Sequence, residues 1–286
     1  MSTDSYPKIS IVTPSYNRKD FIEETMDSIL SQNYPNLELI VIDGGSTAGT
    51  PDIIRRYEKH LKYWVSQKDS GPAEAIANGF KHATGRIFAI LLSDDTYLPG
   101  ALHAVAEAMA DPSIDVLYGN TYWIDGEGNR IGERRQTPFS PKGYLYGATD
   151  LQEPATFWTA DLYWKAGGVD PAVKFAFDTD LFFRFVASGG RFKHINRFLA
   201  SFRIHPTSKS STEFELCAAD LQGLREKHLA FPFHSLRATA IRSMARARRA
   251  LSYAQPGDLL WLLGRIPDRI RSRKSGVIVG PRARAI

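Results

Sequence analysis

Short apolar segments rich in β-branched residues alternate with amphipathic segments along the first part of the chain. The spacing predicts strands over 9–13, 37–42, 63–66 and 87–92, and helices over 20–31, 52–60, 72–83 and 99–110. Such alternation is typical of an α/β fold, in which helices cover both faces of a parallel sheet. Ligands bind these sheets at the carboxyl ends of the strands. We therefore expect the functional site in the loops that follow the strands.

At 286 residues, the chain has the length of one large domain, or of one domain with an appendage. After residue 115 the pattern changes. It predicts a hairpin over 116–131 and a loop over 132–150. Two helices are expected over 160–166 and 179–187, and two strands over 191–196 and 200–204. We expect one domain over 1–212, with halves of about 1–115 and 116–212, and a basic helical C-terminal extension over 213–286.

The composition excludes several classes of protein. The single cysteine, Cys217, leaves no disulfide framework and no zinc site built on several thiolates. The N-terminal residues have neither a basic nor an apolar segment, so we expect no cleaved secretory signal. The longest apolar run, at 87–92, is far shorter than the roughly 18 residues that span a bilayer. These features predict a cytoplasmic protein.

The net charge of +5 is unevenly distributed along the chain. Residues 225–286 contain 14 Lys and Arg against 3 Asp and Glu, whereas the rest of the chain is mildly acidic. The apolar run at 259–263, which includes Trp261, lies between two arginine clusters. This pattern favours peripheral attachment to an anionic membrane surface at the inner face of the cell membrane. Packing of the extension on the body of the protein, and a homodimer contact, are the alternatives.

Two adjacent carboxylates, in Ser93-Asp94-Asp95, directly follow the predicted strand 87–92. Their proximity at a buried strand end is costly unless a positive charge lies beside them. A hard divalent cation meets this need, and Mg²⁺ is commonly held by one or two carboxylates together with substrate phosphates. The cluster therefore predicts a cation site, with an Asp-rich turn as the alternative.

Three other loops carry groups that suit a nucleoside or its phosphates. Asp43 ends the second predicted strand, and its carboxylate can accept a hydrogen bond from a nucleobase imide. Thr13-Pro14-Ser15-Tyr16-Asn17 follows the first strand, where Tyr16 offers a face for stacking. Asp69-Ser70-Gly71 precedes a helix, whose N-terminus favours anions. Ordinary turn and capping roles are the alternatives for all three.

Two aspartates, Asp178 and Asp180, lie at the start of the predicted helix 179–187. Ordinary roles at a helix start, as an N-cap or as a partner of the helix dipole, account well for one aspartate and less well for two. A carboxylate fixed at a helix start among aromatic residues can have a raised pKa and act as a general base. His205 directly follows the last predicted strand. It could be a metal ligand or a phosphate contact, and a structural histidine is the alternative.

Taken together, these segments resemble glycosyltransferase family 2, the inverting enzymes with the GT-A fold. The resemblance covers roughly residues 7–210 and consists of several motifs in order. The matching stretches are 9–17, 38–47, Asp69-Ser70-Gly71, 75–79, Ala83-Thr84-Gly85, Ser93-Asp94-Asp95, Gly167-Gly168-Val169-Asp170, 178–181 with Arg184, and Arg203-Ile204-His205-Pro206. Two positions depart from the family pattern. Ala48 stands where Asp is common, and Phe177 stands where Glu commonly precedes the base.

The resemblance implies a Rossmann-like, mostly parallel sheet and inverting transfer of a sugar from a nucleoside diphosphate sugar of UDP, GDP or dTDP type. It implies a glycan or lipid-linked glycan as the acceptor and Mn²⁺ or Mg²⁺ as the cofactor. The nucleoside would contact Thr13, Pro14, Tyr16, Asn17, Asp43 and Asp69. Asp94 would contact the ribose or the sugar, and Asp95 and His205 would hold the metal. Asp178 would be the catalytic base, with Asp180 as the alternative.

Other functions require features that the sequence lacks. A dehydrogenase needs G-x-G-x-x-G, a P-loop enzyme needs its glycine-rich lysine motif, and neither occurs here. The basic extension alone, without a recognisable module, gives no reason to expect nucleic acid binding. A non-catalytic nucleotide-sugar-binding protein and a nucleotidyltransferase on a similar sheet are the alternatives. We expect donor selection to depend on the loop after Gly132 and on residues 152–156.

Overall fold

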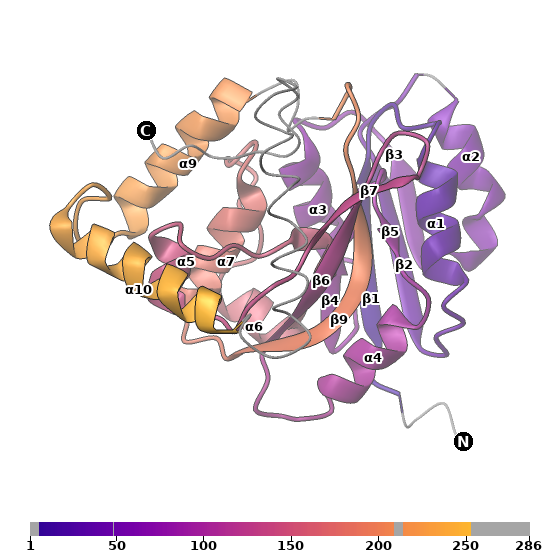
Figure 1. Ribbon diagram of the computed structural model, residues 1–286. Coiled ribbons are helices and arrows are strands. Elements are labelled where there is room, and N and C mark those ends of the chain that lie inside the picture. The colour runs from indigo at the N-terminus through magenta and orange to yellow at the C-terminus, as the bar shows by residue number, and fades with distance from the viewer. Residues whose placement is uncertain (1–5, 48, 209–213, 253–286) are drawn as a thin grey trace.

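The computed structural model describes residues 6–47, 49–208 and 214–252, and within them nine strands form one mixed sheet (Figure 1). The strands are β1 (Ile9–Ser15), β2 (Leu37–Asp43), β3 (Tyr63–Ser66), β4 (Ile87–Ile90), β5 (Thr96–Tyr97), β6 (Val116–Ile124), β7 (Arg130–Arg134), β8 (Thr156–Thr159) and β9 (Phe192–Arg203). The helices are α1 (Ile22–Leu30), α2 (Thr50–Arg56), α3 (Pro72–Phe80), α4 (Ala101–Ala108), α5 (Pro141–Leu145), α6 (Ala160–Lys165), α7 (Phe177–Ala187), α9 (Phe214–His228) and α10 (Leu236–Ser252), with 3-10 turns η2 (Glu58–His60) and η3 (Glu153–Ala155).

The first half forms a parallel sheet in the order β3-β2-β1-β4. Strands β1, β2 and β4 are buried along nearly their whole length, which explains why their sequences are apolar rather than alternating. Ser15 lies opposite Asp43, and Asp43 lies opposite Ser66. The carboxyl ends of β1, β2 and β3 therefore meet at one edge of the sheet, as predicted.

The second half extends the sheet with strands of both directions. Strand β8 lies antiparallel between β4 and β6, and β9 runs parallel to β6. Strand β9 is one continuous element rather than the two that we expected, because its pairing with β6 continues through two register shifts. The segment expected as a loop over 132–150 contains the end of β7 and the short helix α5.

Helices cover the two faces of the sheet (Figure 1), and an apolar layer lies between the helices and the sheet on each face. Helices α1, α2 and α4 supply Met26, Ile54 and Leu102 to one layer. Helices α3 and α7 supply Phe80 and Phe182 to the other. A sheet with helices on both faces confirms the predicted α/β fold class.

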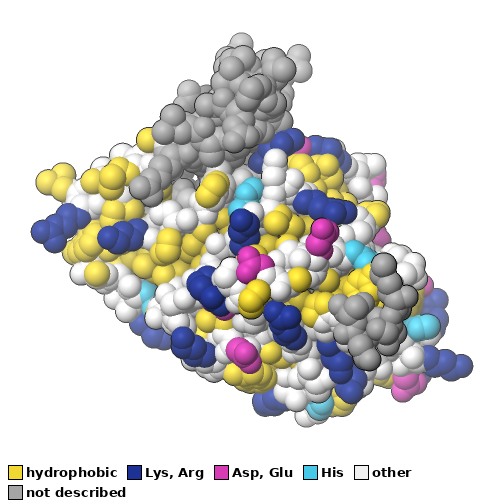
Figure 2. All heavy atoms as spheres, turned by 90° about the horizontal axis from the view of Figure 1, so that it is seen from below, with side chains coloured by type: hydrophobic (Ala, Val, Ile, Leu, Met, Phe, Trp, Pro, Cys, Tyr) yellow, Lys and Arg dark blue, Asp and Glu magenta, His cyan; other side chains and the backbone are white. Residues whose placement is uncertain are grey.

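Figure 2 shows the face that lies at the bottom of Figure 1, where Lys and Arg side chains are spread among acidic ones. Glu38 of β2 forms ion pairs with Lys8 at 3.2 Å and Lys62 at 3.8 Å. Ser10 and Thr84 also donate hydrogen bonds to its carboxylate. Burial alone would raise the pKa of Glu38, but these hydrogen bonds outweigh it and lower the pKa to about 2. Glu38 is therefore a charged link between β1, β2 and the segment before β4.

Replacing Gly79 with Ala is expected to destabilise the fold by about 1–3 kcal/mol, because the new methyl group would overpack the core. Helix α3 lies so close to the sheet that a Cβ on Gly79 would be 2.5 Å from Cγ1 of Val12. Gly223 in α9 is the control, since a Cβ there meets nothing within 4 Å. Urea unfolding should show Gly223→Ala to be stabilising by about 0.5–1 kcal/mol, as helix propensity dictates. Equal effects of the two substitutions would contradict this packing.

The described part of the C-terminal extension packs on the second half of the chain. Leu224 of α9 is buried in the apolar layer that contains α7. The ring of Phe231 stacks on Tyr146 with centroids 4.7 Å apart, and Ala245 of α10 is buried beside α5. The arginine-flanked apolar run at 259–263, on which the membrane prediction rests, lies outside the described residues. None of the described helices combines the length and apolarity needed to cross a bilayer.

Candidate active site

The loops that follow β1 and β2 are joined through Asn17 and Ser46. Asn17 has a left-handed backbone with φ of 52°, and its N–H donates to Oγ of Ser46 at 2.7 Å. In return, the N–H of Thr47 donates to Oδ1 of Asn17 at 3.1 Å. Asn tolerates this backbone conformation better than most residues. The two predicted nucleoside-binding loops therefore form one connected structure.

The Asp43 carboxylate lies beneath this junction and is fully buried. It accepts hydrogen bonds from the hydroxyl of Ser66 at 2.6 Å and from the N–H of Ser46 at 2.9 Å. Of the β1 residues expected at the site, Thr13 and Pro14 are also buried. The Tyr16 side chain is 61% exposed. Tyr16 therefore presents accessible ring surface beside the two joined loops.

Asp69 lies against the β2 loop. A Cβ on Gly44 would be 2.9 Å from both carboxylate oxygens of Asp69, so only glycine permits this approach. Oδ1 of Asp69 also accepts the N–H of Gly71 at 2.9 Å, at the start of α3. The structure thus brings Asp69 to the loop that follows Asp43, as the sequence predicted.

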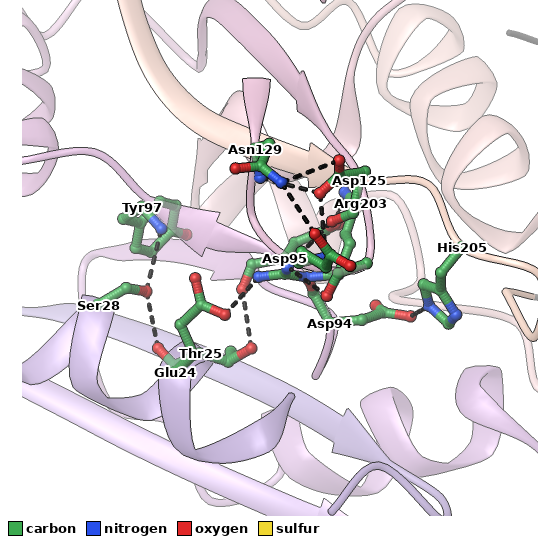
Figure 3. Close-up of polar contacts among 12 residues, drawn as sticks. Glu24, Thr25, Ser28, Asp94, Asp95, Tyr97, Asp125, Asn129, Arg203 and His205 are labelled. Atoms are coloured by element: carbon green, nitrogen blue, oxygen red, sulfur yellow. Dashed lines mark hydrogen bonds and ion pairs between the residues drawn. The ribbon is translucent and has the colours of Figure 1, made fainter. Parts of the chain in front are cut away.

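Asp94 lies beside two nitrogen-bearing side chains at the carboxyl end of β4 (Figure 3). Its Oδ2 is 3.1 Å from Nε2 of His205 and 3.4 Å from Nε of Arg18. Nδ1 of His205 lies 2.9 Å from the hydroxyl of Thr207, so both ring nitrogens have polar partners. His205 therefore contacts Asp94, the first aspartate of the pair. Arg18 follows Asn17 directly and connects this cluster to the nucleoside loops.

Asp95 is almost completely buried, with 1% of its surface exposed. Its Oδ1 accepts the N–H of Arg203 at 2.8 Å, whereas its Oδ2 has no hydrogen-bond partner among the described residues. Burial raises the pKa of Asp95 well above its ordinary value, and the neighbouring charge of Asp94 raises it further. The carboxyl group thus has a buried oxygen without a hydrogen-bond partner among the described residues, beside the charge of Asp94.

The buried guanidinium of Arg203 joins three segments around this pair (Figure 3). Its Nε donates to the carbonyl oxygen of Asp94 at 2.8 Å, and its Nη1 donates to that of Asp125 at 3.1 Å. Its Nη2 forms an ion pair with Glu24 of α1. The sequence analysis assigned Arg203 no role, although it belongs to the motif that contains His205. Arg203 holds the β4 loop, the β6–β7 hairpin and α1 together.

Glu153 is a buried carboxyl group that the sequence analysis placed only in a donor-selecting segment. Glu153 lies in the 3-10 turn η3, directly before β8, and this turn contacts β4, β6 and β9. Burial raises the pKa of Glu153 well above its ordinary value, and the charges of Asp95, Asp178 and Asp94 raise it further. Its Oε1 has no partner among the described residues. The pKa of Glu153 is therefore affected both by the Asp94–Asp95 pair and by Asp178 at the start of α7.

The two aspartates at the start of α7 have different surroundings. Asp180 is fully buried, and its Oδ2 is 2.8 Å from Nε and 2.6 Å from Nη2 of Arg184. Asp178 retains some exposure, and its Oδ1 accepts the N–H of Thr179 at 2.7 Å. Burial raises the pKa of Asp178, although the hydrogen bonds from Thr179 oppose this shift. Asp180 thus has a fixed cationic partner, whereas Asp178 is accessible and has a raised pKa.

No group of three or more His, Cys, Asp or Glu side chains in the described ranges is arranged to hold a metal ion. Asp94 and His205 are in contact. Asp95, which follows Asp94 in the chain, adds an oxygen without a hydrogen-bond partner among the described residues. Mg²⁺ and Mn²⁺ accept such carboxylate ligands and commonly complete their coordination with phosphate oxygens and water. The residues therefore fit a cation that binds together with a diphosphate.

Comparison with curated proteins gives related sequences. The putative teichuronic acid biosynthesis glycosyltransferase TuaG of Bacillus subtilis is 40% identical over 116 residues, which are 39% of this chain and 45% of that protein. This chain thus spans less than half the length of that relative.

Two solved structures share the fold. The mannosyltransferase PcManGT from Pyrobaculum calidifontis, in complex with GDP-Man and Mn²⁺, superposes with a TM-score of 0.61 at 20% identity, covering 94% of this chain and 84% of that one. S. aureus TarS 1-349 in complex with UDP-GlcNAc gives 0.60 at 18% identity, covering 84% of this chain and 72% of that one.

The model of the family described as "Glycosyl transferase family 2" matches residues 10–180. This match includes the strand-end loops, the Asp94–Asp95 pair and the start of α7. It spans more than half of the 286 residues. The chain is therefore a glycosyltransferase with the GT-A fold and belongs to glycosyltransferase family 2.

Proposed function

We propose that this glycosyltransferase moves a sugar from a nucleoside diphosphate sugar to an acceptor hydroxyl with inversion at the anomeric carbon, and that Asp178 is the general base. One observation carries the proposal. Carboxyl groups from three separate parts of the chain lie near one another, since η3, which carries Glu153, contacts β4 and β6, and the charges of Asp95, Asp178 and Asp94 add to burial in raising the pKa of Glu153. A diphosphate beside Asp94 and Asp95 leaves Asp178 as the accessible carboxylate for deprotonating the acceptor. A single displacement needs only one such base.

The joined loops after β1 and β2 are proposed to hold the nucleoside. Tyr16 supplies accessible ring surface, Asp43 and Asn17 fix the loops, and Thr13, Pro14 and Asp69 complete the surroundings of the site. The complexes of TarS with UDP-GlcNAc and of PcManGT with GDP-Man support a nucleotide sugar as the donor. They do not agree on the base, so UDP, GDP and dTDP are all retained as donor types.

Asp95 and His205 would hold the divalent cation, Mn²⁺ or Mg²⁺, and Asp94, which contacts His205, would lie beside it at the ribose or the sugar. The unpartnered Oδ2 of Asp95 and the contact between Asp94 and His205 support this assignment, as does the Mn²⁺ in the PcManGT complex. The bound cation would neutralise the charge that develops on the leaving diphosphate. Arg18 lies on the same carboxylate as His205 and is placed to contribute further positive charge.

A glycan or lipid-linked glycan is the proposed acceptor, in the biosynthesis of a surface polysaccharide. The similarity to a protein named for teichuronic acid biosynthesis supports this class. We further propose a cytoplasmic protein that binds the inner face of the membrane through the basic residues of 213–286. Liposome flotation of the full chain should exceed that of a chain ending near residue 252, which lacks the apolar run at 259–263 and the arginines that follow it, and equal flotation would contradict a membrane role of that part of the extension.

Thermal unfolding with and without nucleotides tests the donor site. One of UDP, GDP and dTDP should raise the melting temperature by several degrees when Mn²⁺ or Mg²⁺ is present, because a ligand at about 100 times its Kd stabilises by about 2.7 kcal/mol. In Asp95→Ala the dependence on the cation should disappear. Asp52→Ala is the control, because Asp52 is an exposed residue of α2. The proposal fails if no nucleoside diphosphate stabilises the wild-type protein.

A further inference from the structure

The helix α7, which presents Asp178, begins without a local cap. The residue at its N-cap position, Ala176, has no side-chain group that could accept a hydrogen bond from the first turn. The first N–H groups of a helix have no partner within the helix and need one elsewhere. Within the first turn, Oδ1 of Asp178 accepts the N–H of Thr179, but the N-cap residue itself adds no hydrogen bond.

A residue of α9 instead holds the loop that directly precedes the N-cap. Oδ2 of Asp220 accepts the N–H of Phe175 at 2.9 Å, across 45 positions of sequence. Phe175 lies three positions before Asp178 in the chain. On the opposite side of the same loop, Nζ of Lys174 donates to Oγ of Ser70 at 3.0 Å. The loop that leads into α7 is thus held by α9 on one side and by the segment before α3 on the other.

Two further residues on the same face of α9 continue this contact, because Asp220, Leu224 and His228 are spaced by four positions. Leu224 is buried in the apolar layer with Phe183. Nε2 of His228 lies 3.6 Å from Oδ1 of Asp180, the second aspartate of α7. Helix α9 therefore follows α7 for two turns (Figure 1), although the sequence places it in the C-terminal extension.

We infer that Asp220 is a positioning residue for the general base. By accepting the N–H of Phe175, the residue directly before the N-cap of α7, it fixes the loop from which the helix begins, and with it the direction of the Asp178 carboxylate toward the acceptor hydroxyl. This inference rests on the proposed function. A displacement of about 1 Å in a reacting group costs up to about 100-fold in rate. The nucleotide loops follow β1, β2, β3 and β4, whereas Asp220 bonds to the loop before α7, so we expect it to affect the catalytic step more than nucleotide binding.

The test compares variants that remove the acceptor atom with one that keeps it. In Asp220→Ala and Asp220→Leu, kcat for nucleoside diphosphate release should fall by about 10- to 100-fold, with KM for the donor and Kd for the nucleoside diphosphate within about twofold of wild type. Asp220→Asn keeps an acceptor oxygen and should retain kcat within about threefold. Gln222→Ala is the matched control, because Gln222 is an exposed residue of α9 that bonds only within its helix.

Three results would overturn the inference. They are an unchanged kcat in both variants, an equal loss of kcat in Asp220→Asn, and a loss of nucleotide binding in both Asp220→Ala and Asp220→Leu. The last result would show a role in folding rather than in positioning. Failure of the proposed function is distinguishable, because the wild-type protein would then bind no nucleoside diphosphate or release none from any nucleotide sugar.

Discussion

Asp178→Asn is expected to lower kcat for sugar transfer by about 100- to 10,000-fold, the usual contribution of a general base. The amide has nearly the same shape but cannot accept the proton of the acceptor hydroxyl. Binding of the nucleoside diphosphate should be unchanged, because the nucleotide loops lie on other elements. Steady-state kinetics together with calorimetric titration of the nucleotide measure both quantities.

Asp180→Asn is the matched control for this substitution. Asp180 is buried and paired with Arg184, so its replacement should destabilise the protein and leave Arg184 without its charge partner. The two variants should therefore differ in what they lose: Asp178→Asn should have a lower kcat, and Asp180→Asn a lower free energy of unfolding. A full loss of rate in a stable Asp180→Asn protein, with Asp178→Asn active, would assign the base to Asp180.

The pH dependence follows from the same carboxyl group. Burial raises the pKa of Asp178 above its ordinary value of 3.8. A base works only when deprotonated, so kcat should rise with pH through this raised pKa, and its acid limb should lie above pH 3.8. The acid limb should be absent from the residual activity of Asp178→Asn.

Arg203→Ala is expected to destabilise the protein by about 1–3 kcal/mol, chiefly because it leaves carbonyl groups without their donor, since the side chain of its ion-pair partner Glu24 is 55% exposed. The substitution leaves the carbonyl groups of Asp94 and Asp125 without their donor and removes the partner of Glu24. Urea unfolding measures the change. Because Arg203 holds the loop that carries Asp94 and Asp95, the remaining folded protein should also lose its cation-dependent nucleotide binding.

Arg55→Ala is the control for Arg203, since Arg55 forms an exposed ion pair with Asp52. Exposed pairs contribute about 0–1 kcal/mol, so this variant should remain close to wild type. Arg203→Lys keeps the charge but loses the planar group of donors, and it should recover only part of the stability. Equal stability of Arg203→Ala and Arg55→Ala would show that the network around Arg203 is not structural.

The parallel half of the fold could be predicted from the sequence because its strands are buried on both faces. Continuous apolar runs such as 87–92 have few other interpretations when helices flank them. Strand β8 was not predicted, because only two apolar residues, Phe157 and Trp158, lie between the threonines at its ends. Strand β9 was divided in two because the exposed residues Asn196 and Arg197 interrupt its apolar pattern, while its pairing with β6 continues.

In the candidate site, too, some residues could be predicted from the sequence and others could not. Groups at the ends of parallel strands, such as Asp43 and Asp94, could be predicted because topology alone brings those ends together. Glu153 and Asp220 could not, since they reach the site through an antiparallel insertion and a helix of the C-terminal extension. Arg203 was part of a quoted motif, but no pattern in sequence shows that a guanidinium is buried among carbonyl groups.

Anomalous diffraction from Mn²⁺ tests the arrangement of the site most directly, in crystals grown with the nucleoside diphosphate that stabilises the protein. We expect a manganese peak coordinated by the diphosphate and by carboxylate oxygen from the Asp94–Asp95 pair, with the base beside Tyr16 and Asp178 facing the diphosphate. A nucleotide bound elsewhere, or a manganese ion distant from both aspartates, would contradict it.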